Sequence, residues 1–224
     1  PYIEAQTKIF PDGESKITFG RVPKKSAIIV VQSTYPPVDT NLLQALSIIS
    51  EARKSSSKIY AIIPYMGYAR QDKQFLSGEV ITMSIVAKMI QMAGATKVIF
   101  VDIHSKTALD HFKIRTENVS AIPELAKYFK KIKLKNPLVV SPDIGGSLRA
   151  KKFAGLLNTD FVALKKSRNR KTGKVQIQSS KVDVNGRDLI VIDDIISTGG
   201  SVVKATQFLK RQKCKRVFVA CTHG

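Results

Sequence analysis

Short runs of consecutive apolar residues recur along the chain, and segments with helical spacing lie between them. Because the strands of a parallel sheet are buried on both faces, such runs predict buried parallel strands. They lie at residues 27–31, 59–63, 98–102, 138–141, 161–164, 189–193 and 217–221. Strands that alternate with helices predict a doubly wound α/β fold, in which helices flank parallel sheets.

The segments between these runs carry apolar residues at the spacing of an amphipathic helix. The first has an apolar stripe formed by Leu42, Ala45, Leu46, Ile49 and Ala52. Asp39 precedes this stripe and is expected to cap the helix N-terminus. The second helix is expected over 80–93, since Gly94 is the usual residue after a helix end. Three further helices are expected at 122–131, 147–157 and 200–211.

The stretch 114–123 has no strong period and separates two groups of strands and helices. Segments of this kind commonly link domains, so we place a boundary near residue 118. Strand ends of similar chemistry recur on both sides, with Asp102 and His104 before the boundary and acidic residues after it. The sequence therefore predicts two similar domains, residues 1–118 and 119–224.

The composition is that of an ordinary folded protein, with 43% hydrophobic and 24% charged residues. The only cysteines, Cys214 and Cys221, form no CxxC pair, which excludes a zinc framework and predicts buried, reduced thiols in a cytoplasmic protein. No apolar run is long enough to span a membrane, so no membrane partner is expected.

The formal net charge of +20 is the least ordinary bulk property. Clustered Lys and Arg bind polyphosphates, so nucleic acid is one candidate partner. The basic residues are spread along the chain, however, in stretches such as 130–135 and 210–216 that fit solvated helix ends equally well. A small phosphorylated substrate would also be attracted by this charge, and nucleic acid is the less favoured partner.

Residues 189–201 form the strongest chemical motif. A buried strand delivers Asp193 and Asp194 to the carboxyl edge of a sheet, where open α/β folds bind ligands. A loop and a helix start follow, and their backbone N–H groups and hydroxyls can hold a phosphate. These anion-binding residues are Ser197, Thr198, Gly199, Gly200 and Ser201. A phosphate cradle beside two acceptors for a vicinal diol suits ribose 5-phosphate, while the simpler alternative is a solvated Asp pair before a Gly-rich turn.

Residues 63–73 form a polar loop directly after a strand. Arg70 offers a rigid fork for phosphate oxygens, and Gln71 can donate to and accept from adenine or ribose. Asp72 and Lys73 add a carboxylate and an ammonium group. The loop can therefore grip a nucleotide, although an ordinary charged turn has a similar composition.

Other segments are ambiguous from their residues alone. Residues 10–14 read as a β-turn, and a lone histidine such as His104 is more often structural than a metal ligand. Asp143 is a hard oxygen ligand of the kind that Mg²⁺ prefers. The basic stretch 165–173 fits a surface hairpin as well as a functional loop.

Taken together, these segments resemble the signatures of the ribose-phosphate pyrophosphokinase family, in an archaeal-like form. Residues 189–201 look like the phosphoribosyl-pyrophosphate loop that this family shares with type I phosphoribosyltransferases. Residues 64–72 resemble the family's PYxxYARQD signature, which the phosphoribosyltransferases lack. Val80 replaces the proline of the Gly-Glu-Pro-Ile stretch that follows, and His111 replaces one aromatic residue after the DxH motif.

The resemblance implies a role for each motif. Phe10, Asp12 and Glu14 would contact adenine from a neighbouring subunit, so at least a dimer with a shared ATP site is expected. His104 would ligate the Mg²⁺ of ATP, and Asp143 lies in the second metal motif. Lys166 and Arg168 would form the catalytic Lys-x-Arg pair, and an alignment of the family's lysine with Lys165 stays open. The remaining ATP contacts would be Arg70, Gln71, Asp72 and Lys73, and the ribose 5-phosphate contacts Asp193, Asp194, Ser197, Thr198, Gly199, Gly200 and Ser201.

The implied activity is transfer of the β,γ-pyrophosphoryl group of Mg-ATP to the anomeric hydroxyl of ribose 5-phosphate, giving phosphoribosyl pyrophosphate and AMP. One alternative is a non-catalytic regulatory homologue, which should have lost metal or loop residues; none is lost here. A second is a nucleic-acid-binding regulator with a phosphoribosyltransferase fold. Compared with the family pattern, the sequence is expected to be incomplete at both ends.

Overall fold

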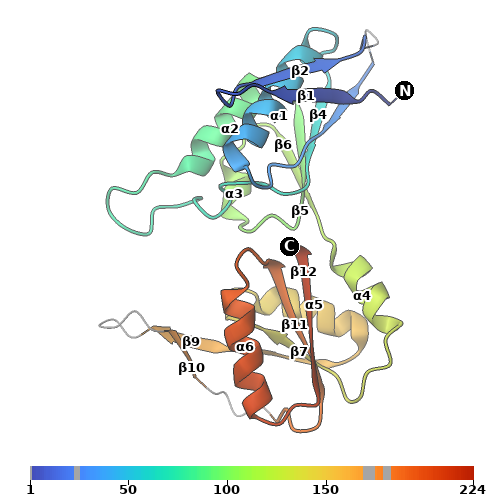
Figure 1. Ribbon diagram of the computed structural model, residues 1–224, viewed down its shortest axis with the longest axis vertical. Coiled ribbons are helices and arrows are strands. Elements are labelled where there is room, and N and C mark those ends of the chain that lie inside the picture. Colours follow the sequence, from blue (N-terminus) through green and yellow to red (C-terminus); the bar gives the residue numbers. More distant parts are fainter. Residues whose placement is uncertain (1, 23–25, 169–174, 179–182) are drawn as a thin grey trace. The chain divides into compact units, whose positions relative to one another are not determined.

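The computed structural model describes residues 2–22, 26–168, 175–178 and 183–224, with the side chains of 166–168 and 175–178 left out of the description. The chain divides into two compact units, Pro1–Val119 and Ser120–Gly224 (Figure 1). Each unit contains a parallel four-stranded sheet with helices packed on it. The predicted α/β class, with parallel sheets flanked by helices, is confirmed.

The sheet of the first unit has its strands in chain order, and all its strand pairs are parallel. The strands are β3 (Ile28–Val31), β4 (Ile59–Ile63), β5 (Lys97–Val101) and β6 (Arg115–Val119). The helices are α1 (Val38–Arg53), α2 (Thr82–Met92) and the short α3 (Thr107–Asp110). Alternate residues of β4 and β5 are fully buried, and they pack with α1 and α2 into one hydrophobic core.

A separate hairpin of β1 (Ala5–Ile9) and β2 (Ser15–Phe19) accompanies this sheet. Its strands are mostly exposed, so packing against a core does not explain its position. The Gln44 side chain on α1 donates a 3.0 Å hydrogen bond to the Ser15 hydroxyl and attaches the hairpin to that helix.

The second unit has a four-stranded parallel sheet in the order β12-β11-β7-β8. The strands are β7 (Leu138–Ser141), β8 (Asp160–Ala163), β11 (Asp188–Ile195) and β12 (Arg216–His223). The helices are α4 (Ile122–Lys130), α5 (Ser147–Leu157) and α6 (Gly200–Arg211). From β7 the chain moves to the neighbouring β8, whereas from β11 it moves the opposite way to β12, so the winding direction reverses between β7 and β11.

This reversal places hydrophobic cores on both faces of the second sheet. Val139, Ile190 and Ile192 pack with α4 and α5 on one face. Leu138 and Val191, from the alternate positions of the same strands, pack with α6 on the other face. Because both faces are covered, β7 and most of β11 are fully buried, as continuous apolar runs predict. Strands β9 (Lys165–Arg168) and β10 (Val175–Gln178) form an antiparallel hairpin beside this sheet.

Several expectations from the sequence were wrong. Asp39 does not cap α1, because the helix begins earlier, with Pro37 at the N-cap and no side-chain cap; Asp39 instead lies in the first turn and accepts a hydrogen bond from the Tyr68 hydroxyl. The stretch 114–123, which has no strong period, contains the strand β6, and no strand was expected there. Cys214 and Cys221 are free thiols but only half-buried.

Candidate active site

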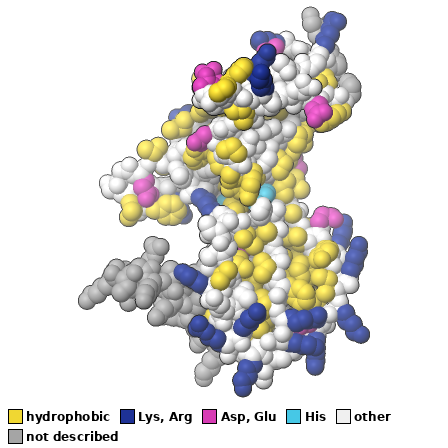
Figure 2. All heavy atoms as spheres, viewed as in Figure 1, with side chains coloured by type: hydrophobic (Ala, Val, Ile, Leu, Met, Phe, Trp, Pro, Cys, Tyr) yellow, Lys and Arg dark blue, Asp and Glu magenta, His cyan; other side chains and the backbone are white. Residues whose placement is uncertain are grey.

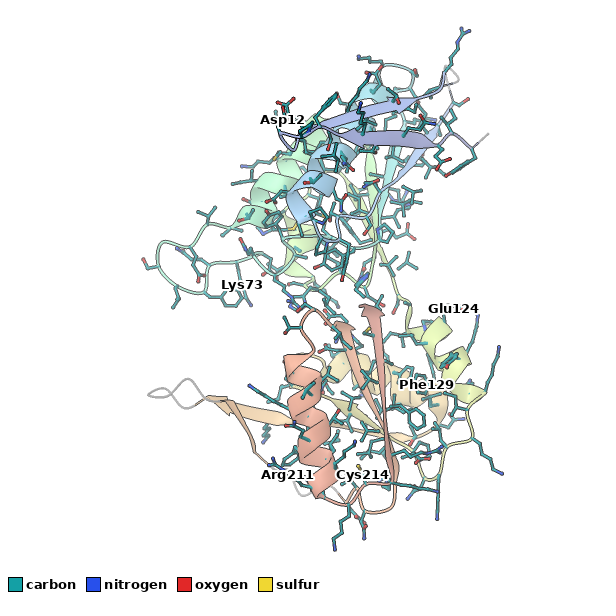
Figure 3. The ribbon with its side chains drawn as sticks, viewed as in Figure 1. Asp12, Lys73, Glu124, Phe129, Arg211 and Cys214 are labelled. Carbon is teal, nitrogen blue, oxygen red and sulfur yellow. The ribbon has the colours of Figure 1, made fainter. Side chains whose placement is uncertain are left out.

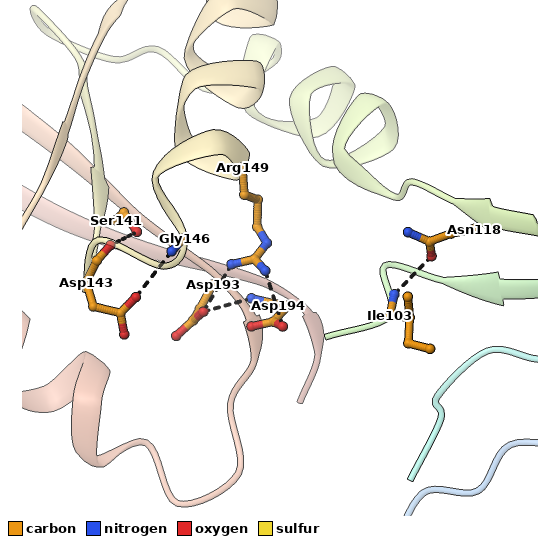
Figure 4. Close-up of polar contacts among 8 residues, drawn as sticks. All are labelled: Ile103, Asn118, Ser141, Asp143, Gly146, Arg149, Asp193 and Asp194. Carbon is orange, nitrogen blue, oxygen red and sulfur yellow. Dashed lines mark hydrogen bonds and ion pairs between the residues drawn. The ribbon is translucent and has the colours of Figure 1, made fainter. Parts of the chain in front are cut away.

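The carboxyl ends of β7 and β11 lie side by side where the winding direction of the second unit reverses. In open α/β sheets this is the place where ligands bind, because the loops after the two strands diverge and leave a crevice between them. Asp143 follows β7, and Asp193 and Asp194 lie near the end of β11 (Figure 4). The fold therefore brings the predicted second metal motif and the predicted diol-binding pair together.

A side chain from α5 contacts both acids at the end of β11. Arg149, in the first turn of α5, places Nη1 3.2 Å from Asp193 Oδ1 and Nη2 3.2 Å from Asp194 Oδ2 (Figure 4). Its side chain is 19% exposed, against 20% for Asp193 and 4% for Asp194. A largely buried guanidinium therefore spans both carboxylates, and no motif in the sequence predicted this contact.

Burial and mutual repulsion perturb the acidic pair. Burial, followed by a hydrogen bond with the Asp194 side chain and the Asp194 charge, raises the pKa of Asp193 to about 6. The Asp194 backbone N–H, which donates a 3.0 Å hydrogen bond to Asp193 Oδ1, acts in the opposite direction, as does the charge of Arg149. The site thus holds two close acidic groups that share hydrogen-bond donors and the charge of one arginine.

The loop after β7 is tightened by two hydrogen bonds around Asp143. The Ser141 hydroxyl donates a 2.7 Å bond to the Asp143 carbonyl, and the Gly146 N–H donates a 3.2 Å bond to Asp143 Oδ1. Gly146 is required here because a Cβ would lie 2.5 Å from Ser141 Oγ and 3.2 Å from Arg149 Nη1. The missing side chain leaves room for both the turn and the guanidinium.

The loop after β11 leads directly into the N-terminus of α6. Ile196 N–H donates a 2.8 Å bond to the His223 carbonyl and anchors the start of the loop. Gly199 has φ 72° at the N-cap, a backbone conformation that favours glycine. Ser197, Thr198 and Ser201 are exposed around it. The first-turn N–H groups of a helix favour an anion, so hydroxyls and helix end together suit a phosphate.

In the first unit, the loop after β4 is held by a buried hydroxyl. Thr34 is fully buried; its Oγ1 donates a 2.8 Å bond to the Tyr65 carbonyl and accepts a 2.7 Å bond from Gly67 N–H. A Cβ at Gly67 would lie 2.5 Å from a methyl group of Val38. These contacts fix the backbone just before Arg70, which is exposed.

The next residues of this loop are tied to two other segments. The Thr82 hydroxyl at the start of α2 donates a 2.7 Å bond to Gln71 Oε1, and a ring nitrogen of His111 lies 2.7 Å from the Asp72 carbonyl. Asp72 is only 3% exposed, and its Oδ2 has no hydrogen-bond partner among the described residues. The loop is therefore held in a set shape, with the exposed Arg70, Gln71 and Lys73 able to reach a ligand.

The turn after β5 is fixed by β6. Asp102 has φ 43°, its N–H donates a 2.8 Å bond to the Val119 carbonyl, and Ile103 N–H donates a 2.9 Å bond to Asn118 Oδ1 (Figure 4). This arrangement leaves His104 exposed, as a metal ligand requires. Asn118 was not recognised from the sequence because it lies in the stretch 114–123, where no strand was expected.

The turn Phe10–Glu14 joins β1 and β2, as the β-turn interpretation predicts. Phe10 N–H donates to the Glu14 carbonyl at 2.8 Å, and Glu14 N–H donates to Asp12 Oδ1 at 3.1 Å. The Phe10 ring is 37% exposed, and Lys8 Nζ lies 5.5 Å from its centroid. Within this unit Asp12 and Lys73 lie apart (Figure 3), so the fold does not bring the hairpin turn to the Arg70 loop of the same chain.

The predicted catalytic residues Lys166 and Arg168 lie in β9, whose backbone pairs with β10; their partners in the ladder are Ile177 and Val175. Their side chains lie outside the described part of the chain, as do residues 169–174 of the basic stretch. The hairpin form is the one expected in the alternative interpretation of this segment as a surface hairpin.

Among the described residues, no three His, Cys, Asp or Glu side chains are grouped so that they could hold a metal ion together. Mg²⁺ prefers hard oxygen ligands such as the Asp143 carboxylate, and it commonly takes only one or two protein groups and completes its shell with water and phosphate oxygens. Asp143 is half-buried, and His104 is exposed. No helix in the described ranges has the length and apolar character needed to cross a membrane.

Comparison with known proteins gives matches for both units. Residues 1–94 match the N-terminal domain of ribose phosphate pyrophosphokinase, and residues 118–224 match the phosphoribosyl transferase domain. The chain is 36% identical to the ribose-phosphate pyrophosphokinase of Sulfurisphaera tokodaii over 226 residues, covering 100% of this chain and 77% of the relative. It is 38% identical to that of Pyrococcus furiosus, covering 100% and 79%. The crystal structure of phosphoribosylpyrophosphate synthetase from Mycobacterium smegmatis superposes with a TM-score of 0.88 at 30% identity, covering 100% of this chain and 74% of that chain.

Proposed function

Since the chain belongs to the ribose-phosphate pyrophosphokinase family of enzymes, we propose that it transfers the β,γ-pyrophosphoryl group of ATP to the anomeric hydroxyl of ribose 5-phosphate. The products are phosphoribosyl pyrophosphate and AMP. The observation that carries this proposal is the arrangement of Asp193 and Asp194 beside the anion-binding N-terminus of α6. One site there offers acceptors for a diol and donors for a phosphate.

Ribose 5-phosphate carries both groups at opposite ends of one small ring. Its 5-phosphate would lie at the loop 197–201, where the helix N-terminus and the exposed hydroxyls supply donors. Its 2- and 3-hydroxyls would donate to Asp193 and Asp194. Charge-assisted hydrogen bonds of this kind are short and about twice as strong as neutral ones, so they orient the sugar as well as hold it.

ATP would be held by the rigid loop after β4. Arg70 suits the phosphate oxygens, Gln71 the adenine or ribose, and Lys73 the triphosphate charge. Asp72 holds the loop from its buried position. Phe10, Asp12 and Glu14 would complete the adenine site from a second copy of the chain, so the active form would be a homo-oligomer of at least two subunits.

The transfer itself is a displacement in which the anomeric oxygen attacks the β-phosphorus while the bond to the α-phosphate oxygen breaks. The protein contributes alignment of the two substrates and positive charge around the moving group. Lys166 and Arg168 would supply part of that charge in the transition state. His104 and Asp143 are the residues that would hold Mg²⁺, which would supply positive charge to offset that of the phosphates.

The alternative of a nucleic-acid-binding regulator rests on the +20 charge alone. On the face shown in Figure 2, the Lys and Arg side chains of the unit Ser120–Gly224 are scattered between other surface rather than joined in one continuous stripe. The alternative of a non-catalytic homologue is disfavoured because the sequence keeps the residues expected of the metal and loop motifs.

The experiment that tests the proposal measures AMP released from ATP with ribose 5-phosphate or Mg²⁺ omitted in turn. AMP should form only when both are present. Chelation of Mg²⁺ should stop the reaction, and its return should restore it. AMP release that is independent of ribose 5-phosphate would reject the proposed transfer, and salt-dependent DNA binding without AMP formation would support the regulator.

A further inference from the structure

Arg149 is the feature of the second unit that the proposed reaction leaves without a role. It reaches from the first turn of α5 to both carboxylates of the diol-binding pair. We propose that Arg149 is a positioning residue that holds Asp193 and Asp194 in the orientation in which they receive the ribose hydroxyls. The inference rests on the proposed function and assigns a residue that none of the recognised motifs includes.

The contacts show how one guanidinium can orient two acids. Nη1 binds Asp193 Oδ1 and Nη2 binds Asp194 Oδ2, each at 3.2 Å. The hydrogen bonds that Arg149 and the Asp194 N–H donate to Asp193 both end on Oδ1. Figure 4 shows the other carboxylate oxygen of Asp193 directed away from Arg149. That oxygen is consequently presented as an acceptor.

Burial makes such an orienting group necessary. Two carboxylates that lie close together repel each other, and water is largely excluded from Asp194, which is 4% exposed. Without a nearby cation the pair would rotate apart or take up a proton, and either change removes an acceptor for the sugar. The planar fork of arginine can bind both acids at once, whereas a lysine ammonium is a single point of charge.

The local backbone makes room for this fork. A Cβ at Gly146 would lie 3.2 Å from Arg149 Nη1, a distance at which the guanidinium would have to shift. The same glycine donates its N–H to Asp143 Oδ1. The loop after β7 and the acid pair of β11 are therefore packed around one guanidinium, which favours a role in site geometry over a solvated surface charge.

The second unit also offers a matched control. Arg187 is exposed to a similar extent, 16%, and donates hydrogen bonds to the carbonyls of Asn136 and Pro137. It precedes β11, whereas the acid pair lies near that strand's end. An Arg187→Gln variant loses a comparable buried guanidinium but leaves the acid pair untouched.

The test compares ribose 5-phosphate binding by calorimetry in the full chain and in Arg149→Gln, Arg149→Lys and Arg187→Gln, each checked for folding by circular dichroism. We expect Arg149→Gln to raise the dissociation constant about tenfold or more, the loss that accompanies one misplaced charge-assisted hydrogen bond. Arg149→Lys should recover part of the affinity, and Arg187→Gln should match the unchanged protein. Should Arg149→Gln fail to fold, the Arg149→Lys variant decides through its own loss of affinity.

A double-mutant cycle separates positioning from direct contact. If Arg149 acts through the acids, adding Arg149→Gln to Asp193→Asn should cost much less than it does in the unchanged protein. Independent, multiplicative losses would overturn the positioning role, and so would an unchanged affinity in folded Arg149→Gln and Arg149→Lys. Absence of ribose 5-phosphate binding in the unchanged protein would instead reject the proposed function, and this inference with it.

Discussion

Arg216 binds Asp188 through two donors, with Nε 3.0 Å from Oδ1 and Nη2 2.6 Å from Oδ2. The Asp188 side chain is fully buried, and Lys135 N–H donates a further 2.6 Å bond to Oδ2. The carboxylate thus joins the first residues of β11 and β12 to the segment before β7. The hydrogen bond from Arg216, more than any other cause, lowers the pKa of Asp188 to about 2.

The first prediction concerns this pair and the pH dependence of stability. Because the folded pKa lies below the ordinary value of about 3.9, the ionised carboxylate stabilises the fold fully above pH ~4, and this contribution is lost as the pH falls through about 2. Asp188→Asn should lower the free energy of unfolding at pH 7 by about 1–3 kcal/mol. The free energies of unfolding of the two proteins, measured by denaturant titration, should approach each other as the pH falls from 4 to 2. A difference that stays constant over that range would contradict the assignment.

The second prediction concerns the diol-binding pair. Asp193→Asn and Asp194→Asn keep the side-chain shape but remove charge and acceptor capacity. Each should weaken ribose 5-phosphate binding roughly 10–150-fold, which corresponds to the loss of one charge-assisted hydrogen bond of about 1.5–3 kcal/mol. ATP binding should be much less affected. Substrate saturation curves for each ligand measure this.

A suitable control for the pair is Asp160→Asn, since the Asp160 side chain is 87% exposed at the start of β8, in the same unit. That variant should behave as the unchanged protein does. An unaltered dependence on ribose 5-phosphate in both site variants would show that Asp193 and Asp194 are structural.

The third prediction is that Asp193 titrates near pH 6 in the ligand-free protein. Because its folded pKa is raised, the folded state holds the proton more tightly than the unfolded chain does. The stability that protonated Asp193 contributes to the folded state is therefore complete below pH ~4 and lost as the pH rises through about 6. Asp194→Asn removes the neighbouring charge and should lower this pKa, as read from the carboxyl carbon resonance. An equal or higher pKa in that variant would show that Asp194 is not a cause of the shift.

The fourth prediction concerns the basic residues of β9. Lys166→Ala and Arg168→Ala should each lower kcat by about 10²–10⁴ with KM changed only a few-fold, since charge on a transferring group develops mainly in the transition state. The double variant should fall well short of the product of the single losses if the segment acts as a unit. Lys165→Ala tests the register and should have a much milder defect. A near-normal kcat in Lys166→Ala would show that the segment is a solvated hairpin without a catalytic role.

Buried elements were predicted well because burial leaves a clear record in the sequence. The bounds of α5 and α6 were predicted to the residue, and β4 and β7 likewise. Continuous apolar strands and striped helices can be recognised without knowing their neighbours. The predicted signature residues of the second unit, Asp143, Asp193 and Asp194, also meet at one sheet edge as parallel strand ends should.

The exposed strands β1 and β6 were missed for the opposite reason. In β6 only the second of five residues is even partly buried, so no alternation of apolar and polar residues marks it as a strand. Its position depends on pairing with β5, a contact distant in the sequence. The role of Asn118 was therefore not predicted either, although its side chain holds the turn before His104.

Arg149 could not be identified because its partners lie about 44 positions away in the sequence. A lone arginine in the first turn of an amphipathic helix reads as a solvated charge. Only the strand order, which places β7 beside β11, brings that helix turn to the acid pair. The sequence did not reveal where the strand order reverses. The useful signal is a polar residue in the first helical turn after a glycine-rich loop, where that loop follows a strand beside the reversal.

Phosphorus NMR of the full chain with Mg-ATP and ribose 5-phosphate tests the central claim most directly, because it observes the fate of every phosphate at once. The account predicts that AMP and phosphoribosyl pyrophosphate appear in equal amounts, as the diphosphoryl unit moves intact from the β position. ADP as the stoichiometric nucleotide product, or AMP accompanied by free pyrophosphate, would contradict it.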